Sequence, residues 1–322
     1  MSGAMELGAS RILLTGARGM LARDLVPVLN RHAYVLQLSD LRGPCSCSSE
    51  ILALDITKSK EVLDVVEDFR PNWIVNCAAF TNVDGAEDCS EVAHAINGIA
   101  VGNLASAANA VGAAVLQIST DYVFSGNDAA GVRKIGFDEA VLPRPIGVYA
   151  QSKYVGELLV RRLLPNNHLI VRTSWLHGVH GANFVDTMLR VGRGREELKV
   201  VDDQIGSPTW TAWLAYVLER LISKEARGMF HVASRGNISW LDFAKEIFSL
   251  ANSLEVNGSD KYAVRVVPQS TAELARKAPR PAFSTLDVRK VEEFLQQECI
   301  SWKEGLKQHL LAIRAMRQEK KQ

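Results

Sequence analysis

The sequence predicts an α/β protein built on a doubly wound parallel sheet, with a smaller α/β lobe toward the carboxyl end. Short apolar, β-branched runs alternate with longer segments of helical period, which is typical of a parallel sheet covered by helices on both faces. A glycine-containing turn follows the first of these runs and leads directly into a helical segment. The 322 residues, 47% hydrophobic and 23% charged, suffice for one or two domains with a large core.

The alternation assigns each element a range. The expected strands are 11–15, 34–38, 73–77, 115–119, 169–172 and 229–232, and a further short strand precedes Asp55. The expected helices are 20–31, 58–69, 87–111, 149–163, 183–191, 209–222, 240–251 and 302–318. The βαβ order is regular up to about residue 173 and loosens after it. We therefore expect residues 1–173 to form mainly the sheet domain and 174–322 mainly the second lobe, with segments near 205–233 returning to the sheet.

Charge and cysteine content argue against several classes of function. The 37 basic and 36 acidic side chains leave a formal charge of +1, which provides no field for nucleic acid or an anionic membrane. No apolar run approaches the ~20 residues that cross a bilayer, and the amino terminus lacks the pattern of a signal peptide. The five cysteines form no C-x-x-C pair, which predicts no metal site. We expect a cytoplasmic protein with neither nucleic acid nor membrane as a partner.

The first strand runs into the turn Gly16-x-x-Gly19-x-x-Ala22. The first glycine allows a tight turn, the second lets the backbone approach a pyrophosphate, and the small third residue lets the helix pack closely. Glycines are common in such turns, so the motif alone is weak. Asp40, which closes the second strand ~24 residues later, strengthens it, because an acid there binds ribose hydroxyls. The turn predicts a Rossmann domain that binds a nicotinamide dinucleotide through Gly16, Arg18, Gly19, Met20, Leu21 and Asp40.

The choice of coenzyme stays open on the sequence. Asp40 favours the free ribose of NADH, whereas Arg18 and Arg42 on adjacent loops could meet the 2′-phosphate of NADPH. Two later strand ends are further candidates, one expected beside the adenine and one beside the nicotinamide ribose. Each fits an ordinary strand end equally well, and their residues are Asp55, Ile56, Ala78 and Ala79.

A second constellation carries the chemistry. Thr120 ends a predicted strand, and Tyr149 and Lys153 share one helix face one turn apart. A nearby ammonium stabilises phenolate and lowers the tyrosine pKa from ~10, which favours a general acid/base. An isolated Y-x-x-x-K pattern is usually a solvated helix face, but the glycine turn, Thr120 and a loop break at 143–147 precede this one in the order that the chemistry needs. We predict that Thr120 hydrogen-bonds to the substrate oxygen, Tyr149 moves its proton, and Lys153 also holds the nicotinamide ribose.

The strings TGARGMLA, NCAAFTNVDGAED, QISTDYVFSG, YAQSKYVGE, IVRTSWLHG and VVDDQIGSPTW occur in this order and span most of the chain. On them the chain resembles the extended short-chain dehydrogenase/reductases and, more narrowly, the dTDP-4-dehydrorhamnose reductase family. The resemblance implies a dinucleotide-binding domain, a substrate-binding lobe, and NADPH- or NADH-dependent reduction of the C4 keto group of a dTDP-4-keto-6-deoxy sugar. It leaves open a homodimer and a Mg²⁺ ion at a subunit contact.

The same resemblance implies the residues around the sugar. It gives Thr120, Tyr149 and Lys153 catalytic roles and suggests that the substrate is bound by Thr81, Asp121, Tyr122, Trp175, Asn183, Gln204 and Arg280. Nucleotide-sugar 4,6-dehydratases carry Asp-Glu after the Thr, whereas Tyr122 follows Asp121 here, so the elimination machinery is missing. Ala150 and Gly85 depart from the family pattern, and the stretch Cys45 to Ser49 has no role that the sequence supplies.

Two alternatives remain on the sequence alone. The chain could reduce or epimerise another nucleotide sugar, and an epimerase would show no net consumption of coenzyme. It could also be a non-catalytic regulatory subunit resembling the β chain of methionine adenosyltransferase, which shares the fold. An intact set of Thr120, Tyr149 and Lys153 favours the enzyme.

Overall fold

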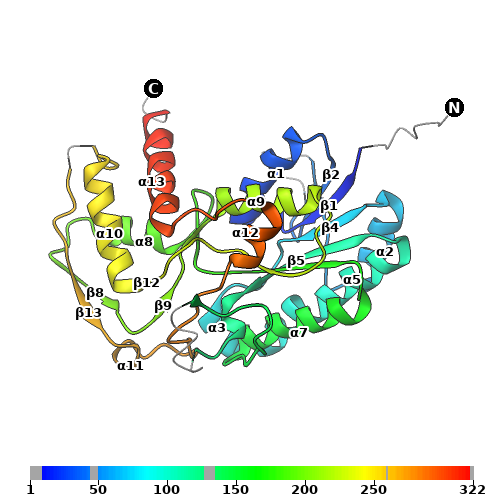
Figure 1. The fold of residues 1–322 in the computed structure, drawn as a ribbon, viewed down its shortest axis with the longest axis horizontal. Coiled ribbons are helices and arrows are strands. Elements are labelled where there is room, and N and C mark those ends of the chain that lie inside the picture. Colours follow the sequence, from blue (N-terminus) through cyan, green and yellow to red (C-terminus); the bar gives the residue numbers. More distant parts are fainter. Residues whose placement is uncertain (1–8, 44–49, 127–134, 259, 320–322) are drawn as a thin grey trace.

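The computed structural model describes residues 9–43, 50–126, 135–258 and 260–319. Its centre is a seven-stranded sheet in the order β11-β6-β5-β4-β1-β2-β3, with every neighbouring pair parallel. The predicted doubly wound parallel sheet is confirmed (Figure 1). The strands are β1 (Arg11–Thr15), β2 (Val35–Asp40), β3 (Ile51–Ala53), β4 (Trp73–Asn76), β5 (Ala114–Thr120), β6 (His168–Thr173) and β11 (Gly228–His231).

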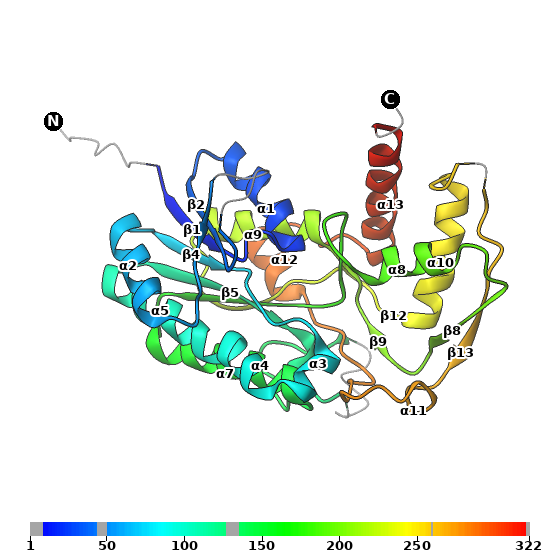
Figure 2. The same ribbon diagram turned by 180° about the vertical axis from the view of Figure 1, so that it is seen from behind.

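Helices cover both faces of this sheet. Successive residues of a strand point to opposite faces, so Ile12 and Leu14 enter one core and Leu13 enters the other. One face carries α1 (Met20–Arg31) and α9 (Thr211–Ser223), whereas the other carries α2 (Ser59–Phe69), α5 (Ala100–Val111) and α7 (Val148–Leu163). Figure 2 shows the two helix layers from behind.

The helix expected at 87–111 is in fact a chain of shorter segments. These are α3 (Val83–Asp88), α4 (Ser90–His94), a π-helical turn (Ala95–Ile99) and α5. The buried Asn97 of the π turn accepts a hydrogen bond from Phe80 N at 2.8 Å and donates to Ser152 Oγ at 3.0 Å. It thereby ties the loop after β4 to helix α7. Single π turns inside helices are frequent at functional sites, and this one holds Phe80, whose neighbours Ala79 and Thr81 line the cavity described below.

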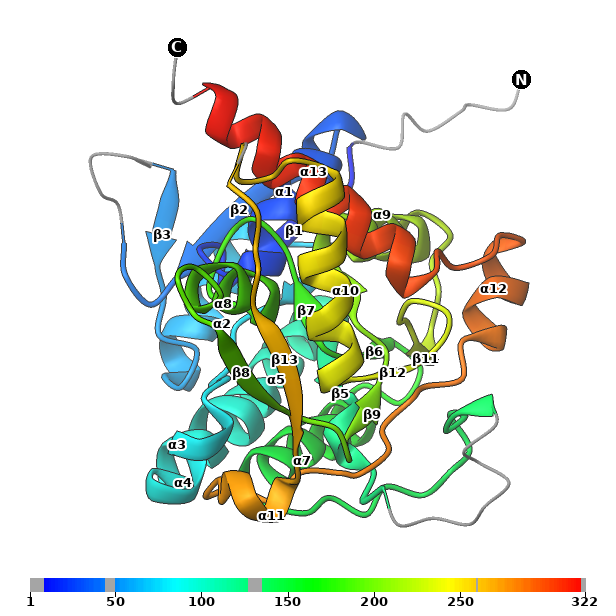
Figure 3. The same ribbon diagram turned by 90° about the vertical axis from the view of Figure 1, so that its left-hand side faces the viewer.

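The carboxyl-terminal lobe has a core of its own. It contains α8 (Phe184–Val191), α10 (Trp240–Ser253) and α13 (Trp302–Glu319), with β8 (Glu197–Val201) parallel to β13 (Arg265–Gln269). Figure 3 views the molecule from the side of this lobe. The sequence missed β8 and β13, because both are short and β13 is largely exposed and contains Pro268. It also missed α11 (Thr271–Leu274) and α12 (Arg289–Leu295).

Short crossing segments connect the lobe to the sheet domain. They pair as β7 (Leu176–His177) with β10 (Thr209–Trp210) and as β9 (Ile205–Gly206) with β12 (Ile238–Ser239). The chain then returns to the sheet through α9, which packs on α1, and through β11, which pairs with β6. The division of function between residues 1–173 and 174–322 stays a prediction. None of the described helices is both long and apolar enough to traverse a bilayer.

Candidate active site

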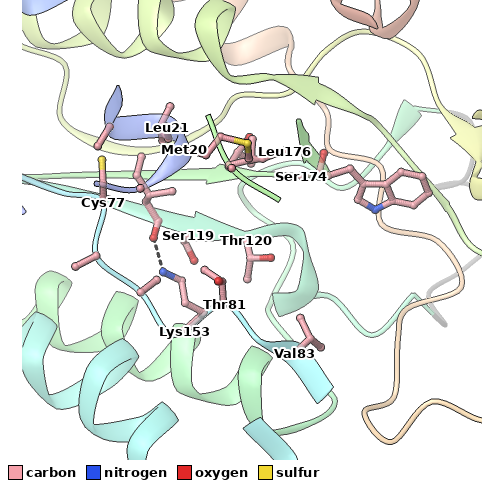
Figure 4. Close-up of a pocket in the computed structure, with 18 of the residues that line it drawn as sticks. Met20, Leu21, Cys77, Thr81, Val83, Ser119, Thr120, Lys153, Ser174 and Leu176 are labelled. Carbon is pink, nitrogen blue, oxygen red and sulfur yellow. Dashed lines mark hydrogen bonds between the residues drawn. The ribbon is translucent and has the colours of Figure 1, made fainter. Parts of the chain in front are cut away.

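A cavity of about 720 Å³ lies at the carboxyl ends of the central strands, where the sheet domain faces the lobe. Met20 and Leu21 line it from helix α1, and Thr120 and Lys153 line it from β5 and α7 (Figure 4). Trp240 closes it from the lobe. Ligands of open α/β sheets bind in this position, outside the carboxyl ends of the strands.

The glycine turn is built for close approach between two backbone segments. Gly16 has φ +70°, and a Cβ on it would lie 2.5 Å from Ala78 N, so a side chain is excluded there. Gly19 N donates to Gly16 O at 2.9 Å, and α1 begins at the next residue. Gly16 is not among the residues that line the cavity, whereas Arg18, Gly19, Met20 and Leu21 line it together with Ala78 and Ala79. The amino end of α1 thus faces the cavity in the arrangement that binds a pyrophosphate.

Of the two acidic residues expected near the adenosine, Asp40 contacts this turn and Asp55 bonds to Thr57. Asp40 Oδ2 accepts a hydrogen bond from Arg18 N at 3.0 Å, and the Arg18 guanidinium donates to Gly43 O at 2.6 Å. Asp55 accepts from the backbone and hydroxyl of Thr57, and these bonds lower the pKa of its carboxyl. Ile56 is buried in the core beside α5. None of Asp40, Asp55 and Ile56 lines the cavity as it stands, so their contacts with the coenzyme remain predictions.

The three predicted catalytic residues meet in the cavity. Tyr149 and Lys153 come from the first turns of α7, and Thr120 ends β5. Lys153 Nζ donates to Ile118 O at 2.7 Å, which is the bond drawn in Figure 4. Burial lowers the pKa of Lys153 to about 8, against the opposing effect of Glu157. With a pKa of about 8, the Lys153 ammonium can lose and regain its proton close to neutral pH.

The expected effect of Lys153 on Tyr149 is wrong for this arrangement. Burial, followed by the charge of Asp121, raises the pKa of Tyr149 to about 12, and the hydrogen bond with Thr120 offsets only part of this. Lys153 is not among the groups that shift the pKa of this phenol, and its ammonium donates to the Ile118 carbonyl. Tyr149 is therefore held as the neutral acid, ready to donate a proton.

Asp121 is the most unusual carboxyl group of the site. Its side chain is 2% exposed and lines the cavity. The Thr120 hydroxyl donates to Asp121 Oδ1 at 3.2 Å and accepts from Tyr122 N at 3.2 Å. Burial raises the pKa of Asp121 to about 7 despite these bonds and one with Ser284. Oδ2 has no hydrogen-bond partner among the described residues.

Of the other substrate candidates, Thr81, Tyr122 and Trp175 line the cavity. Trp175 has φ +45°, a conformation that bulky residues rarely adopt, and its ring stacks on Trp240 with centroids 3.4 Å apart. A Cβ on Gly206 would lie 2.5 Å from this indole, which explains the glycine. Strain of this kind is typical of ligand-binding positions.

Three substrate candidates are not brought to the cavity. Asn183 caps α8, accepting from Asp186 N at 3.1 Å and donating to Gly178 O at 2.8 Å. Gln204 donates to Thr271 Oγ1 at 2.9 Å. Arg280 forms an ion pair with Asp84 at 2.9 Å and a hydrogen bond with the Tyr122 side chain, so it adjoins the site through that ring. Sequence motifs do not separate such supporting residues from direct contacts.

A buried ion pair behind the catalytic residues escaped the sequence analysis. Glu157 accepts from Arg172 Nη2 at 2.7 Å, from Arg172 Nε at 2.9 Å and from Ser119 Oγ at 2.5 Å. Both charged side chains are at most 1% exposed. Glu157 stands one helical turn after Lys153, so it continues the face that carries Tyr149. That i+4 spacing was the signal available in the sequence.

Metal binding finds no support in the described part of the chain. No group of three or more His, Cys, Asp and Glu side chains is placed there to hold an ion. The Mg²⁺ ion left open by the resemblance therefore has no identified ligand set. Of the cysteines, Cys77 lines the cavity, but burial raises the pKa of its thiol to about 12 and keeps it unreactive. Cys45 to Ser49 lie outside the described residues.

Comparison with known proteins identifies the family. A family model described as the RmlD substrate binding domain matches residues 10–315. The dTDP-4-dehydrorhamnose reductase of Streptomyces griseus is 42% identical over 283 residues, covering 86% of this chain and 85% of the relative. The Escherichia coli K12 enzyme of that name is 34% identical over 308 residues, covering 93% and 96%. The solved dTDP-4-dehydrorhamnose reductase of Bacillus anthracis in complex with NADP superposes with a TM-score of 0.84 at 40% identity, covering 94% and 99%. The expected resemblance is confirmed, and the chain belongs to the RmlD substrate-binding-domain family.

Proposed function

We propose that this chain reduces the C4 keto group of a dTDP-4-keto-6-deoxy sugar with a nicotinamide coenzyme, giving dTDP-L-rhamnose from dTDP-4-dehydrorhamnose. One observation carries the proposal: Thr120, Tyr149 and Lys153 converge on the cavity into which the glycine turn and the start of α1 also open. Relatives of matching length that bear the name of this reductase support it.

The residues present fit a bound dinucleotide. The Gly16–Ala78 contact leaves backbone free to approach a pyrophosphate, and a cavity of about 720 Å³ is within the usual size of ligand pockets. The coenzyme supplies a hydride when bound. Arg18, Gly19 and Met20 would hold its diphosphate end, and Ala78, Ala79 and Lys153 would hold its nicotinamide half. We take NADPH as the preferred form, because the Bacillus anthracis relative was solved with NADP.

Side chains of this protein can supply the proton that the keto oxygen receives during reduction. A keto oxygen between Thr120 and Tyr149 would accept a hydrogen bond from each hydroxyl, and negative charge would develop on it during reduction. Tyr149 is held neutral by burial and by Asp121, so it is the group that protonates this oxygen. Trp175 and Trp240 would shield the sugar from water on the side of the lobe.

A spectrophotometric assay tests the proposal. The purified protein is mixed with NADPH and with dTDP-4-keto-6-deoxy sugar made in a coupled reaction, and absorbance of the reduced coenzyme is followed. We expect oxidation that depends on the keto sugar, with dTDP-glucose, which has no keto group, as the matched control. Absence of oxidation with any dTDP-keto sugar would refute the proposal. Conversion of sugar without oxidation would instead identify an epimerase. A homodimer and a cytoplasmic location stay predictions.

A further inference from the structure

The loop between β7 and α8, residues 178–183, packs against the first turn of helix α1. A Cβ on Gly181 would lie 3.4 Å from Met20 Cβ, and Asn183 Nδ2 donates to Met20 Sδ at 3.9 Å. Asn183 also donates to Gly181 O at 3.0 Å, which holds the loop in this shape. His180 and Gly181 line the cavity from this loop. The loop therefore places a histidine beside the turn where the amino end of α1 faces the cavity.

The imidazole of His180 is held by an acid that does not itself line the cavity. His180 Nε2 lies 3.7 Å from Asp24 Oδ1, so the protonated ring forms an ion pair with this residue of α1. Thr211, the first residue of α9, donates from Oγ1 to Asp24 Oδ2 at 2.5 Å. A Cβ on Gly178 would collide with Thr211 Oγ1, which explains the glycine where the loop meets α9. Helices α1 and α9 together thus fix where the imidazole lies.

The diphosphate of a dinucleotide would bring two negative charges to this turn. Three of the described residues that line the cavity can carry a positive charge, namely Arg18, Lys153 and His180. The Arg18 guanidinium donates to Gly43 O at 2.6 Å, and Lys153 Nζ donates to Ile118 O at 2.7 Å. The amino end of α1 contributes only about half an elementary charge. His180 is therefore the cation of this wall whose charge is not already directed to a backbone carbonyl.

We infer that His180 is a further coenzyme-binding residue, whose imidazolium contacts the diphosphate of the nicotinamide coenzyme while Asp24 and Thr211 hold the ring in place. The inference rests on the proposed function. The proposed substrate carries a diphosphate too, but His180 is anchored to α1, whose amino end is the expected site of the coenzyme diphosphate. Trp175 and Trp240 line the cavity on the side of the lobe, where the sugar is expected.

The charges around Asp24 are compatible with this role. Burial raises the pKa of Asp24, whereas the Thr211 hydrogen bond and the charges of His180 and Arg23 lower it. Arg23 is exposed and does not line the cavity, so it does not compete with His180 for a ligand there. The ion pair of Asp24 with protonated His180 has no net charge. It therefore repels a bound diphosphate less than an unpaired carboxylate would.

Ligand binding by His180→Ala tests the inference. Fluorescence titrations with NADPH, with NADH and with dTDP give a Kd for each ligand. Both coenzymes carry the same diphosphate, so we expect both Kd values to rise by the same factor, about 10- to 100-fold, as for loss of a hydrogen bond to a charged group. The Kd for dTDP should stay within about twofold of wild type, which also shows that the variant is folded. His180→Lys keeps a cation on the loop and should hold both coenzyme Kd values within about threefold of wild type.

The other outcomes separate the coenzyme diphosphate from other ligands. His32→Ala, which removes an exposed imidazole at the carboxyl end of α1, is the matched control and should leave all three Kd values unchanged. Unchanged coenzyme affinity in His180→Ala would refute the inference. A loss confined to NADPH would refute it by assigning the ring to the 2′-phosphate, and a comparable or larger loss for dTDP would refute it by assigning the ring to the substrate.

The lysine variant and wild type complete the test. If His180→Lys binds both coenzymes as weakly as His180→Ala, the charge of the side chain is not what binds the diphosphate, and the inference is refuted. If wild type itself binds neither NADPH nor NADH, the proposed function fails, and not the role of His180 alone. Wild-type binding of both coenzymes with an unchanged His180→Ala variant would refute the inference and leave the proposed function standing.

Discussion

The two walls of the cavity are built in different ways. On the sheet side, Thr120, Tyr149 and Lys153 stand on β5 and α7, whose packing fixes where each side chain points. On the lobe side, Trp175 and Trp240 come from short connections and the start of α10, and Trp175 is held in a strained backbone conformation. Rigid elements carry the proton chemistry, whereas loops that are free to vary shape the substrate pocket. Substitutions on the first wall should therefore affect rate, and substitutions on the second should affect affinity.

The largest effect is expected on the sheet side, from Tyr149→Phe. Loss of the proton donor should lower kcat by about 10²–10⁴ while the Kd for NADPH stays near wild type, because the ring still packs in place. Steady-state kinetics and fluorescence titration of the coenzyme measure the two quantities. A variant that reduces the sugar at the wild-type rate would contradict the assignment of Tyr149.

The variant Glu157→Gln tests how far the buried Glu157–Arg172 ion pair stabilises the sheet side of the cavity. The change leaves the Arg172 guanidinium charged and unpaired at 1% exposure, which we expect to lower the free energy of unfolding by about 3–5 kcal/mol. Urea denaturation measures it. The matched variant Asp64→Asn removes an exposed ion pair with Lys60 and should cost less than about 1 kcal/mol. Equal costs for the two variants would mean that the buried pair does not organise this wall.

The pH dependence of stability sharpens the description of Asp121. Because its pKa is raised to about 7 in the folded state, the folded protein holds more protons than the unfolded chain between about pH 4 and 7. The contribution of Asp121 to stability is thus fully present below pH ~4 and is lost as the pH rises through about 7, with a slope of at most ~1.4 kcal/mol per pH unit.

Asp121→Asn should abolish that dependence. From pH 5 to 7 the stability of wild type relative to the variant should fall by about 2 kcal/mol, as measured by urea denaturation. The groups that face Asp121 are Thr120, Ser284, Tyr122 and Tyr149, none of which ionises in this range. A difference between the two proteins that is independent of pH would show that Asp121 is ionised throughout.

The smallest effect is expected on the lobe side, from Trp240→Ala. Loss of the stacked pair with Trp175 should raise KM for the sugar about 2- to 10-fold, corresponding to roughly 0.5–1.5 kcal/mol, with kcat little changed. Phe294→Ala, which removes a partly exposed ring on α12, is the matched control. A large fall in kcat for Trp240→Ala would show that the lobe side takes part in the chemistry.

The same contrast between the walls explains what the sequence could predict. The strand predicted at 11–15 and the helix predicted at 20–31 match β1 and α1. Both predictions depend only on nearby residues, namely the spacing of apolar side chains and the glycine turn. The position of Tyr149 and Lys153 on one helix face follows from their spacing alone. The π turn that holds Asn97 does not, since it depends on contacts with Phe80 and Ser152 that are distant in the chain.

The sequence also could not predict the direction in which the pKa of Tyr149 is shifted. The four-residue spacing of Tyr149 and Lys153 suggested that the ammonium would lower the pKa of the phenol, yet burial, followed by the charge of Asp121, raises it. Burial cannot be read from spacing. In the lobe, Asn183, Gln204 and Arg280 lie in motifs of the family, but their partners are an Asp186 amide, Thr271 and Asp84.

The destination of the hydride tests the central claim most directly. The protein is supplied with NADPH in which both hydrogens at C4 of the nicotinamide are deuterium, together with a dTDP-4-keto-6-deoxy sugar, and the sugar product is examined by NMR. We predict one deuterium at C4 of the product, with an equivalent amount of coenzyme oxidised. Deuterium at another carbon, or a product without deuterium, would contradict reduction of the C4 keto group at this site.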